Sequence, residues 1–150
     1  MAATITTLYK DYVNGQEEGI ISVSIPSSDI LLANSTPIDI IDSPGANKAV
    51  LLTGAVFRID TYGGIPYATN TNLSLVYDTS LTIINIFSAR LATASICKFL
   101  PSNNVVMGIH ISPTSIESNK KVQLYVSGGN PTAGNSTIIV YVSYKIIPAN

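Results

Sequence analysis

The chain has 150 residues, of which 8 are Lys or Arg and 9 are Asp or Glu, so its formal net charge is −1 and only 11% of its residues are charged. This fraction is about half of that in an average soluble domain, and the scattered lysines with a pI near 5.6 exclude a surface for binding nucleic-acid phosphates. A mean hydropathy of +0.35 excludes intrinsic disorder, and the lack of an apolar run of roughly 18 residues excludes a membrane-spanning helix.

The first 18 residues differ from the rest of the chain. They carry four of the 17 charged residues and a break at Asn14-Gly15, and they lack the basic and apolar regions of a secretory signal. Residues 1–18 are therefore either an N-terminal arm, which is a candidate attachment segment, or an ordinary first strand with its loop. We expect synthesis in a cytoplasm without export by the general secretory route.

The remaining residues, 19–150, predict one strand-rich domain. Ile, Val and Thr account for 21, 11 and 14 residues of the chain, and β-branched side chains suit pleated, half-buried strands. The predicted strands cover residues 19–25, 37–42, 48–62, 73–78, 81–87, 105–111, 121–127 and 136–147. A helical turn at 27–33, capped by Ser and Asp side chains, and an ambiguous segment at 88–97 lie between them. About eight or nine strands so spaced predict an all-β fold, an antiparallel β-sandwich of jelly-roll type.

Two of these strands have patterns that predict which side chains face the core. The strand at 48–62 is expected to place Leu51, Ala55, Phe57 and Ile59 on one face. The strand at 73–78 alternates apolar and polar side chains, which is typical of a half-buried strand with one face in water.

The search for nucleophilic chemistry gives no catalytic constellation. His110 is the only histidine, it lies in an apolar strand pattern, and no Gly-x-Ser-x-Gly sequence accompanies it. Cys97 is the only cysteine and has a neighbouring lysine, but without a local signature it is interpreted as a small buried side chain. We therefore expect no enzymatic activity and no catalytic residues.

The carboxylates also fail to form a recognisable site. Asp39 and Asp42 lie three residues apart in a predicted strand, so they point to opposite faces and cannot act as a general acid–base pair. Asp60 and Asp78 end strands and meet only if a loop brings them together. No loop carries the cluster of oxygen ligands that calcium requires, and we expect neither a metal nor a cofactor.

The low charge itself points to assembly. Soluble β proteins protect their sheet edges with charged residues and prolines, and this chain has few of the former. A strand-rich surface with so few charges associates with other proteins unless copies of the chain or a larger assembly cover it. The sequence therefore predicts a protein that acts through protein–protein interfaces.

Several turn segments carry a resemblance to known proteins. They are residues 27–48 (SSDILLANSTPIDIIDSPGANK), 63–73 (GGIPYATNTNL), 129–137 (GNPTAGNST) and 140–145 (VYVSYK). In this order and spacing, over roughly residues 20–147, the chain resembles small virion structural proteins of tailed bacteriophages. Residues 1–18 fall outside the match.

The resemblance implies a capsid decoration (cement) or head-fibre protein located in the virion and assembled in the host cytoplasm. Its partners would be copies of itself, as a homo-oligomer and by expectation a trimer, and the major capsid protein or another virion protein, with no nucleic acid and no membrane. In the N-terminal arm, Leu8, Tyr9 and Tyr12 are the expected apolar anchors, since aromatic side chains dominate interface energetics. The other candidate interface residues are Ile65, Tyr67 and Tyr141.

An alternative function belongs to another class. The chain is then a tail or fibre-tip module that binds a host-surface glycan, with Tyr62, Tyr67 and Tyr77 exposed as stacking platforms. This alternative predicts exposed tyrosines beside Asp or Asn in a groove, whereas the decoration role predicts tyrosines in protein contacts.

Overall fold

The computed structural model describes residues 2–61, 64–65, 67–68, 72–78, 85–90, 105–106 and 117–149. Within these ranges the chain is mostly strand, which confirms the all-β class. The strands are β1 (Thr4–Val13), β2 (Gln16–Ile25), β3 (Ile38–Ile41), β4 (Lys48–Thr61), β5 (Asn72–Tyr77), β6 (Asn85–Arg90), β7 (Val105–Val106), β8 (Val122–Ser127) and β9 (Thr137–Pro148). The helix described is the single turn α1 (Ser27–Ile30), and no described helix has the length and apolar character needed to cross a membrane.

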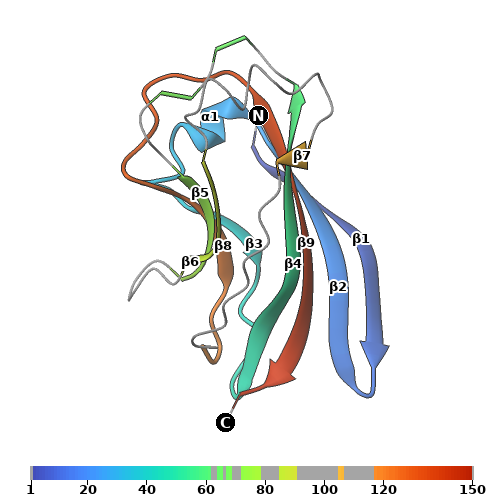
Figure 1. Ribbon diagram of the computed structural model, residues 1–150. Coiled ribbons are helices and arrows are strands. Elements are labelled where there is room, and N and C mark those ends of the chain that lie inside the picture. Colours follow the sequence, from blue (N-terminus) through green and yellow to red (C-terminus); the bar gives the residue numbers. More distant parts are fainter. Residues whose placement is uncertain are drawn as a thin grey trace.

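The described strands form two antiparallel sheets (Figure 1). One sheet has the order β1-β2-β9-β4-β7 and the other has the order β3-β8-β5-β6. Four of the pairs are nested along the chain: β2 with β9, β3 with β8, β4 with β7 and β5 with β6. These four pairs contribute four strands to each sheet, and β1 is the additional strand at the edge of the first sheet.

One hydrophobic core receives side chains from both sheets. From Gly19 to Ile25 in β2 and from Thr137 to Tyr144 in β9 every second residue is buried, as the period of a strand requires. Val23 and Val140 of the first sheet and Leu75 and Leu124 of the second have no exposed surface. Because each fully buried aliphatic side chain contributes roughly 1.5–3 kcal/mol, this shared core holds the two sheets together.

The prediction of which β4 side chains face the core is wrong for the first half of the strand. Val50 and Leu52 are buried before a β-bulge that shifts the register between Leu52 and Gly54, and Ala55 and Phe57 are buried after it. The bulge inserts one residue, so the inward-facing positions change from even to odd numbers. Leu51 therefore lies on the face opposite to Ala55 and Phe57.

Two further local predictions are also wrong. In β5, Ser74 and Val76 are as fully buried as Leu73 and Leu75, so this strand is covered on both faces. The helical turn α1 begins after Pro26, whose side chain has no hydrogen-bonding group, so α1 has no side-chain cap. The Asp29 carboxylate instead accepts a hydrogen bond from the Ala3 backbone N–H at 2.7 Å.

Several sequence predictions fall outside the described residues. They concern residues 81–84, 91–97 and 107–111, Tyr62, His110 and Cys97. The side chain of Asp60 lies outside the described part as well.

Candidate functional site

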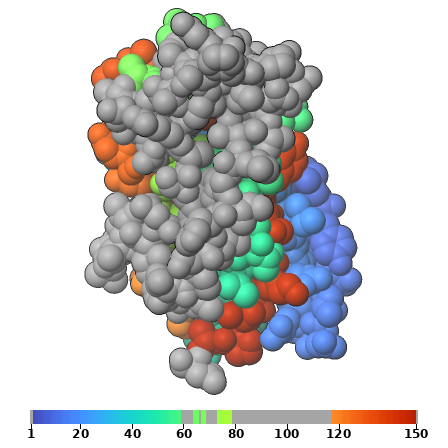
Figure 2. Space-filling model, viewed as in Figure 1, coloured from blue at the N-terminus to red at the C-terminus, as the bar shows by residue number. Residues whose placement is uncertain are grey.

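Among the strands whose burial the structure describes, the most exposed is β1, at the edge of the five-stranded sheet. All ten of its residues are exposed, and its residues form a blue ridge along one side of the molecule with those of β2 (Figure 2). The reason is the strand count, since the described part of the four-stranded sheet has no strand opposite β1. Both faces of β1 are therefore open, which is unusual for a strand of this length.

Exposed apolar side chains concentrate on β1 and its neighbour β2. The exposed fractions are 46% for Ile5, 54% for Leu8, 44% for Tyr9, 63% for Tyr12, 43% for Val13 and 39% for Ile20. Large apolar residues exposed together, rather than singly, mark an interaction surface.

The register of β1 with β2 assigns these side chains to two faces. Ile5 and Thr7 pair with Val23 and Ile21, and Lys10 and Tyr12 pair with Gly19 and Glu17, so these four side chains of β1 lie on the inward face, the side of the core. Thr4, Thr6, Tyr9, Asp11 and Val13 lie on the outward face. A bulge at Leu8 separates the two halves of the strand, so the inward-facing positions change from odd to even numbers.

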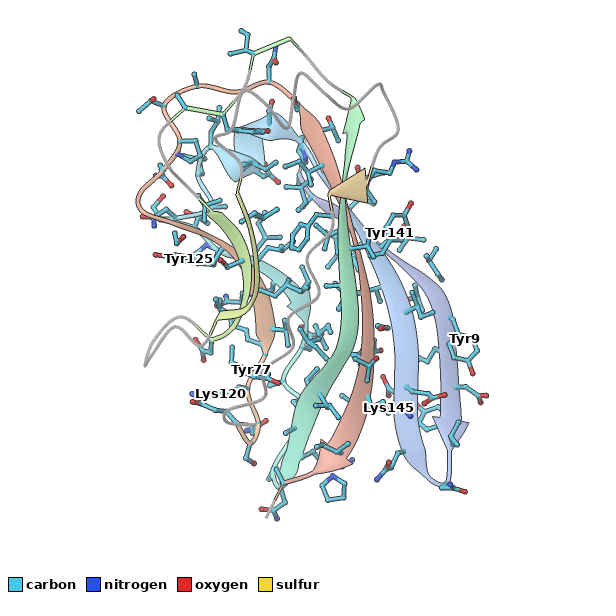
Figure 3. All side chains as sticks on the ribbon, in the orientation of Figure 1. Tyr9, Tyr77, Lys120, Tyr125, Tyr141 and Lys145 are labelled. Carbon is cyan, nitrogen blue, oxygen red and sulfur yellow. The ribbon has the colours of Figure 1, made fainter. Side chains whose placement is uncertain are left out.

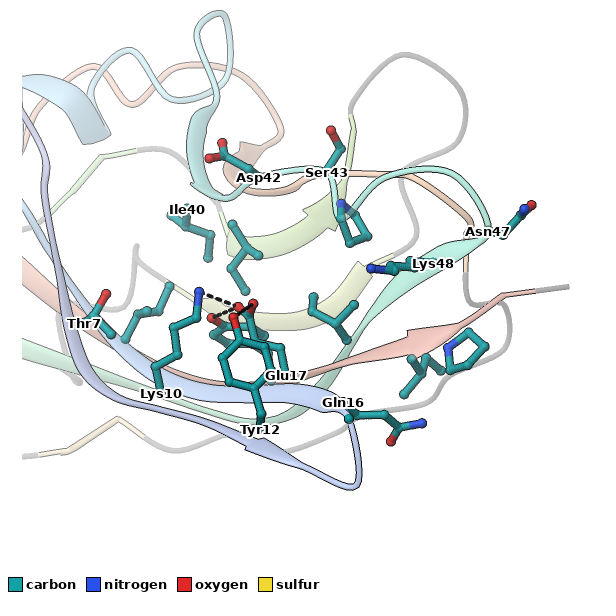
Figure 4. Close-up of a pocket in the computed structure, with 18 of the residues that line it drawn as sticks. Thr7, Lys10, Tyr12, Gln16, Glu17, Ile40, Asp42, Ser43, Asn47 and Lys48 are labelled. Carbon is teal, nitrogen blue, oxygen red and sulfur yellow. Dashed lines mark hydrogen bonds and ion pairs between the residues drawn. The ribbon is translucent and has the colours of Figure 1, made fainter.

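The inward face borders a groove with a volume of about 690 Å³ (Figure 4). Its other wall consists of residues 40–48, which end β3 and lead into β4, and Tyr144 and Ile146 of β9 also line it. The groove thus lies between the inward face of β1 and β2 and the segment that follows β3, which is the edge of the second sheet among the described strands.

A polar network occupies the groove around Glu17. The Glu17 carboxylate accepts hydrogen bonds from the hydroxyls of Tyr12 at 3.3 Å and Tyr144 at 3.1 Å. Its Oε1 atom lies 3.1 Å from the Lys10 ammonium, which lies 5.9 Å from the centre of the Tyr12 ring. The two charges of the inward face therefore neutralise each other.

The contacts of Glu17 determine the direction in which its pKa is shifted. Partial burial acts to raise the pKa of the carboxyl group, but the hydrogen bonds from Lys10, Tyr144 and Tyr12 outweigh it, so the pKa lies below its ordinary value. The hydrogen bond to Glu17 in turn raises the pKa of Lys10. Burial, followed by the hydrogen bond to Glu17, raises the pKa of Tyr144.

Gly19 makes the network possible. It pairs directly with Tyr144 in the sheet, and a Cβ atom at this position would lie 2.9 Å from Cε1 of the Tyr144 ring. Without a side chain at Gly19 the ring crosses β2 and its hydroxyl reaches Glu17. Aromatic rings cover strand glycines in this way in other sheets.

The outward face has a different charge. Asp11 lies directly opposite Glu18 in the register, and Glu18 forms an ion pair with Lys145 at 2.9 Å. Around Glu18, two carboxylates and one ammonium give this end of the outward face one excess negative charge. Tyr9 and Tyr141 lie on the side away from the four-stranded sheet (Figure 3).

The predicted interface residues do not gather at one place. Leu8, Tyr9 and Tyr12 lie together on β1, and Ile65 is 51% exposed elsewhere. Tyr141 of β9 is half-buried on the outward face. Tyr67 is a core residue, only 3% exposed, whose hydroxyl donates to the carbonyl of Ser136, so it is not part of the surface.

Sequence reasoning missed Ile5, Glu17, Gly19 and Ile20 as parts of this surface. The sequence of residues 4–13 does not show which side chains face the core. This is because β1 lies at a sheet edge with both faces exposed, so neither face needs to be apolar. The signal that was present is Gly19 in an otherwise apolar strand, since an isolated glycine in a strand marks a close approach of another group.

Two of the carboxylates singled out from the sequence, Asp39 and Asp78, each lie beside a different lysine. In this part of the chain no group of three His, Cys, Asp or Glu side chains is placed to hold a metal ion. Asp39 interacts with Lys121 at 3.0 Å and Gln123 at 2.6 Å, and Asp78 lies 3.8 Å from Lys120. Tyr67 and Tyr77 are buried, so neither is a stacking platform for a glycan as the alternative function requires.

Comparisons of the chain with protein-family models, with curated proteins and with solved structures gave no match.

Replacing Glu17 by Gln tests the network. A carboxyl whose pKa is lowered by folding stabilises the native state above its unfolded pKa, roughly 4.3, and this stabilisation is lost as the pH falls through the lower, folded pKa. We expect Glu17→Gln to lower the free energy of unfolding by less than about 1 kcal/mol at neutral pH, because the pair is partly exposed. At a pH below the folded pKa, where Glu17 is protonated in both states, the wild type and Glu17→Gln should be equally stable.

The measurement is urea denaturation at about pH 7 and about pH 3. Glu18→Gln is the matched control for loss of a carboxylate, since its ion pair lies on the outward face. An equal loss of stability for Glu17→Gln at both pH values would contradict the role of the charged carboxylate.

Proposed function

We propose that this chain is a jelly-roll β-sandwich that serves as a non-enzymatic structural protein of a tailed-bacteriophage virion. The nested pairing of β2–β9, β3–β8, β4–β7 and β5–β6 supports the jelly roll, because a long hairpin rolled into two sheets produces this order. Jelly rolls recur in viral capsid proteins, which is an analogy at the level of fold.

One observation carries the assembly role: β1 exposes all ten of its residues and a cluster of large apolar side chains with them. Exposed apolar side chains do not stabilise a monomer in water. A complex in which a partner covers β1 is stabilised by the burial of Leu8, Tyr9 and Tyr12. The chain is then an auxiliary or decoration protein, or a head fibre, that works as a homo-oligomer on the capsid.

The capsid contact is assigned to the outward face of the hairpin that β1 and β2 form. Tyr9, Val13 and Ile20 on the outward face, beside the excess negative charge of Asp11 and Glu18, are the surface proposed for the capsid. A neutral or basic patch on the major capsid protein would complement this charge.

Removing residues 2–15 tests the attachment. These residues include all of β1, whose side chains are exposed, so the shortened chain is expected to fold. We expect it to lose its place on particles of the phage whose genome encodes it. The measurement is a cryo-electron microscopy reconstruction of particles assembled with the full-length or the shortened chain.

Each outcome of that reconstruction decides a point. Density for the full-length chain on the capsid, absent for the shortened chain, supports the proposal. Full occupancy by the shortened chain overturns the attachment through β1. Density at the tail tip favours the glycan-binding alternative, and absence of the full-length chain from the particle overturns the virion role.

A further inference from the structure

The turn that joins β1 to β2 consists of two residues, Asn14 and Gly15, at the tip of the hairpin (Figure 1). Both have positive φ angles, +52° and +76°, and both are exposed. A type I′ turn requires positive φ angles at both of its central residues, and Asn-Gly is a preferred sequence for it. This turn therefore sets the register in which β1 pairs with β2.

The same two residues form a chemically reactive pair. Asn14 is the one asparagine of the sequence that a glycine follows, and Gly15 has no side chain to hinder an approach to its backbone nitrogen. Within the part of the chain that the structure describes, neither the Gly15 N–H nor the Asn14 side-chain amide makes a hydrogen bond. Water therefore reaches both groups, and no hydrogen bond holds them apart.

We propose that Asn14 is a site of spontaneous deamidation, for which water is the co-reactant. The Gly15 backbone nitrogen gives up its proton to water and attacks Cγ of Asn14. The new N–Cγ bond closes a succinimide ring, and the bond from Cγ to Nδ2 breaks, so ammonia leaves after taking up a proton from water. Addition of water to either ring carbonyl then opens the ring to an aspartate or an isoaspartate. One water is consumed and one ammonia is released, with no oxidation or reduction.

Asn47 provides a comparison within the same chain. It is exposed, and its φ angle of +59° is close to that of Asn14. The next residue is Lys48, which carries a long side chain and whose N–H donates to the Gly45 carbonyl at 3.3 Å. The nitrogen that would attack Asn47 is therefore hindered and hydrogen-bonded, whereas Gly15 has neither constraint within the described residues.

The two products have different effects on the hairpin. An aspartate leaves the main chain unchanged, and Asp-Gly also suits a type I′ turn. An isoaspartate carries the main chain through its Cβ and Cγ atoms and so adds one atom to the loop, and a type I′ turn then no longer fits between Val13 and Gln16. The pairing with β2 is what holds β1, because all ten of its residues are exposed. The isoaspartate product therefore loosens β1, the strand to which the proposed function assigns the capsid contact.

Mass spectrometry of the aged chain tests the site. The purified protein is kept in mildly alkaline buffer, and cleavage after Lys10 and Glu17 releases residues 11–17, in which Asn14 is the one asparagine. Replacement of the amide NH₂ by OH raises the mass of this peptide by about 1 Da. We expect the deamidated fraction at Asn14 to be several times that at Asn47. Asn14→Gly, which keeps a sequence that suits the turn, should abolish the mass gain.

Hydrogen exchange tests the effect on β1. In aged protein that contains isoaspartate, detected by enzymatic methylation of isoaspartyl residues, we expect the amides of β1 to exchange faster and those of β9 to remain unchanged, because β9 lies between β2 and β4. Freshly purified Asn14→Asp is the matched control, since it adds the charge without the extra main-chain atom, and its β1 amides should exchange as in fresh wild type.

The outcomes separate the site from its effect. A deamidated fraction at Asn14 no larger than that at Asn47, or the same mass gain in Asn14→Gly, would overturn the site. Unchanged exchange of β1 in the isoaspartate product, or equally fast exchange in Asn14→Asp, would contradict the loosening of the hairpin. Only the consequence for the capsid contact rests on the proposed function. Because these measurements use the purified chain, they are independent of whether it is found on a phage capsid.

Discussion

Replacing Gly134 by Ala is expected to lower the free energy of unfolding by about 3 kcal/mol. Gly134 has a φ angle of +138°, and a Cβ atom there would lie 2.1 Å from Cδ1 of the Tyr67 ring. Tyr67 cannot move away easily, because it is buried and its hydroxyl donates to the Ser136 carbonyl. The substitution therefore combines backbone strain with overpacking of the core.

Gly129→Ala is the control for the backbone strain alone. Gly129 has a φ angle of +107° and no atom within 4 Å of the position of its Cβ, so we expect a loss of only about 1–2 kcal/mol. In a Tyr67→Ala background, Gly134→Ala should cost no more than Gly129→Ala does in the wild type. Equal losses for the two glycine substitutions in the wild-type chain would show that the ring is not the obstacle. Urea denaturation measures the wild type, the three single variants and the Tyr67→Ala/Gly134→Ala double variant.

Replacing Tyr77 by Phe is expected to lower the free energy of unfolding by about 1–3 kcal/mol, because it leaves a buried carbonyl without its partner. The Tyr77 hydroxyl, on β5, donates to the Val50 carbonyl on β4. This hydrogen bond joins the two sheets through the core.

The same substitution should change the response to alkali. Burial, and then the nearby charge of Glu117, raises the pKa of Tyr77 to about 12, whereas a tyrosine in the unfolded chain ionises near pH 10. Between these values the unfolded chain releases its proton first, so stability falls as the pH rises. Tyr77→Phe should lose less stability from about pH 9 to about pH 12 than the wild type. Parallel pH profiles for the two proteins would contradict the buried, protonated hydroxyl.

Local patterns predicted the strands that face a core and failed where a residue is inserted. The strands at 19–25, 121–127 and 136–147 correspond to β2, β8 and β9 within a few residues, because runs of β-branched and aromatic residues bounded by turn residues are typical of strands. In β4 the bulge after Leu52 reverses the faces. The signal for this insertion is Gly54, since an isolated glycine in a strand marks a bulge or a close approach of another group. A Cβ atom at Gly54 would lie 2.9 Å from Oγ of Ser143.

The candidate site was predictable only in part. Leu8, Tyr9 and Tyr12 are apolar residues in a charged segment, and this contrast marked them before the structure placed them on β1. The groove was not predictable, because it arises from two sheets of unequal strand number. The prediction that Tyr67 lies at the surface was wrong because its burial depends on a distant part of the chain. Its ring packs against Gly134, 67 residues later.

The nested pairing of the strands has a consequence for synthesis. β2 pairs with β9, which lies more than a hundred residues later, and the remaining pairs close inside this one. Contacts between residues so distant in sequence form slowly, because the loop between them must close first. The first sheet therefore cannot form at the ribosome before β9 has emerged. Until then the apolar strands depend on chaperones or on rapid completion of the chain to avoid aggregation.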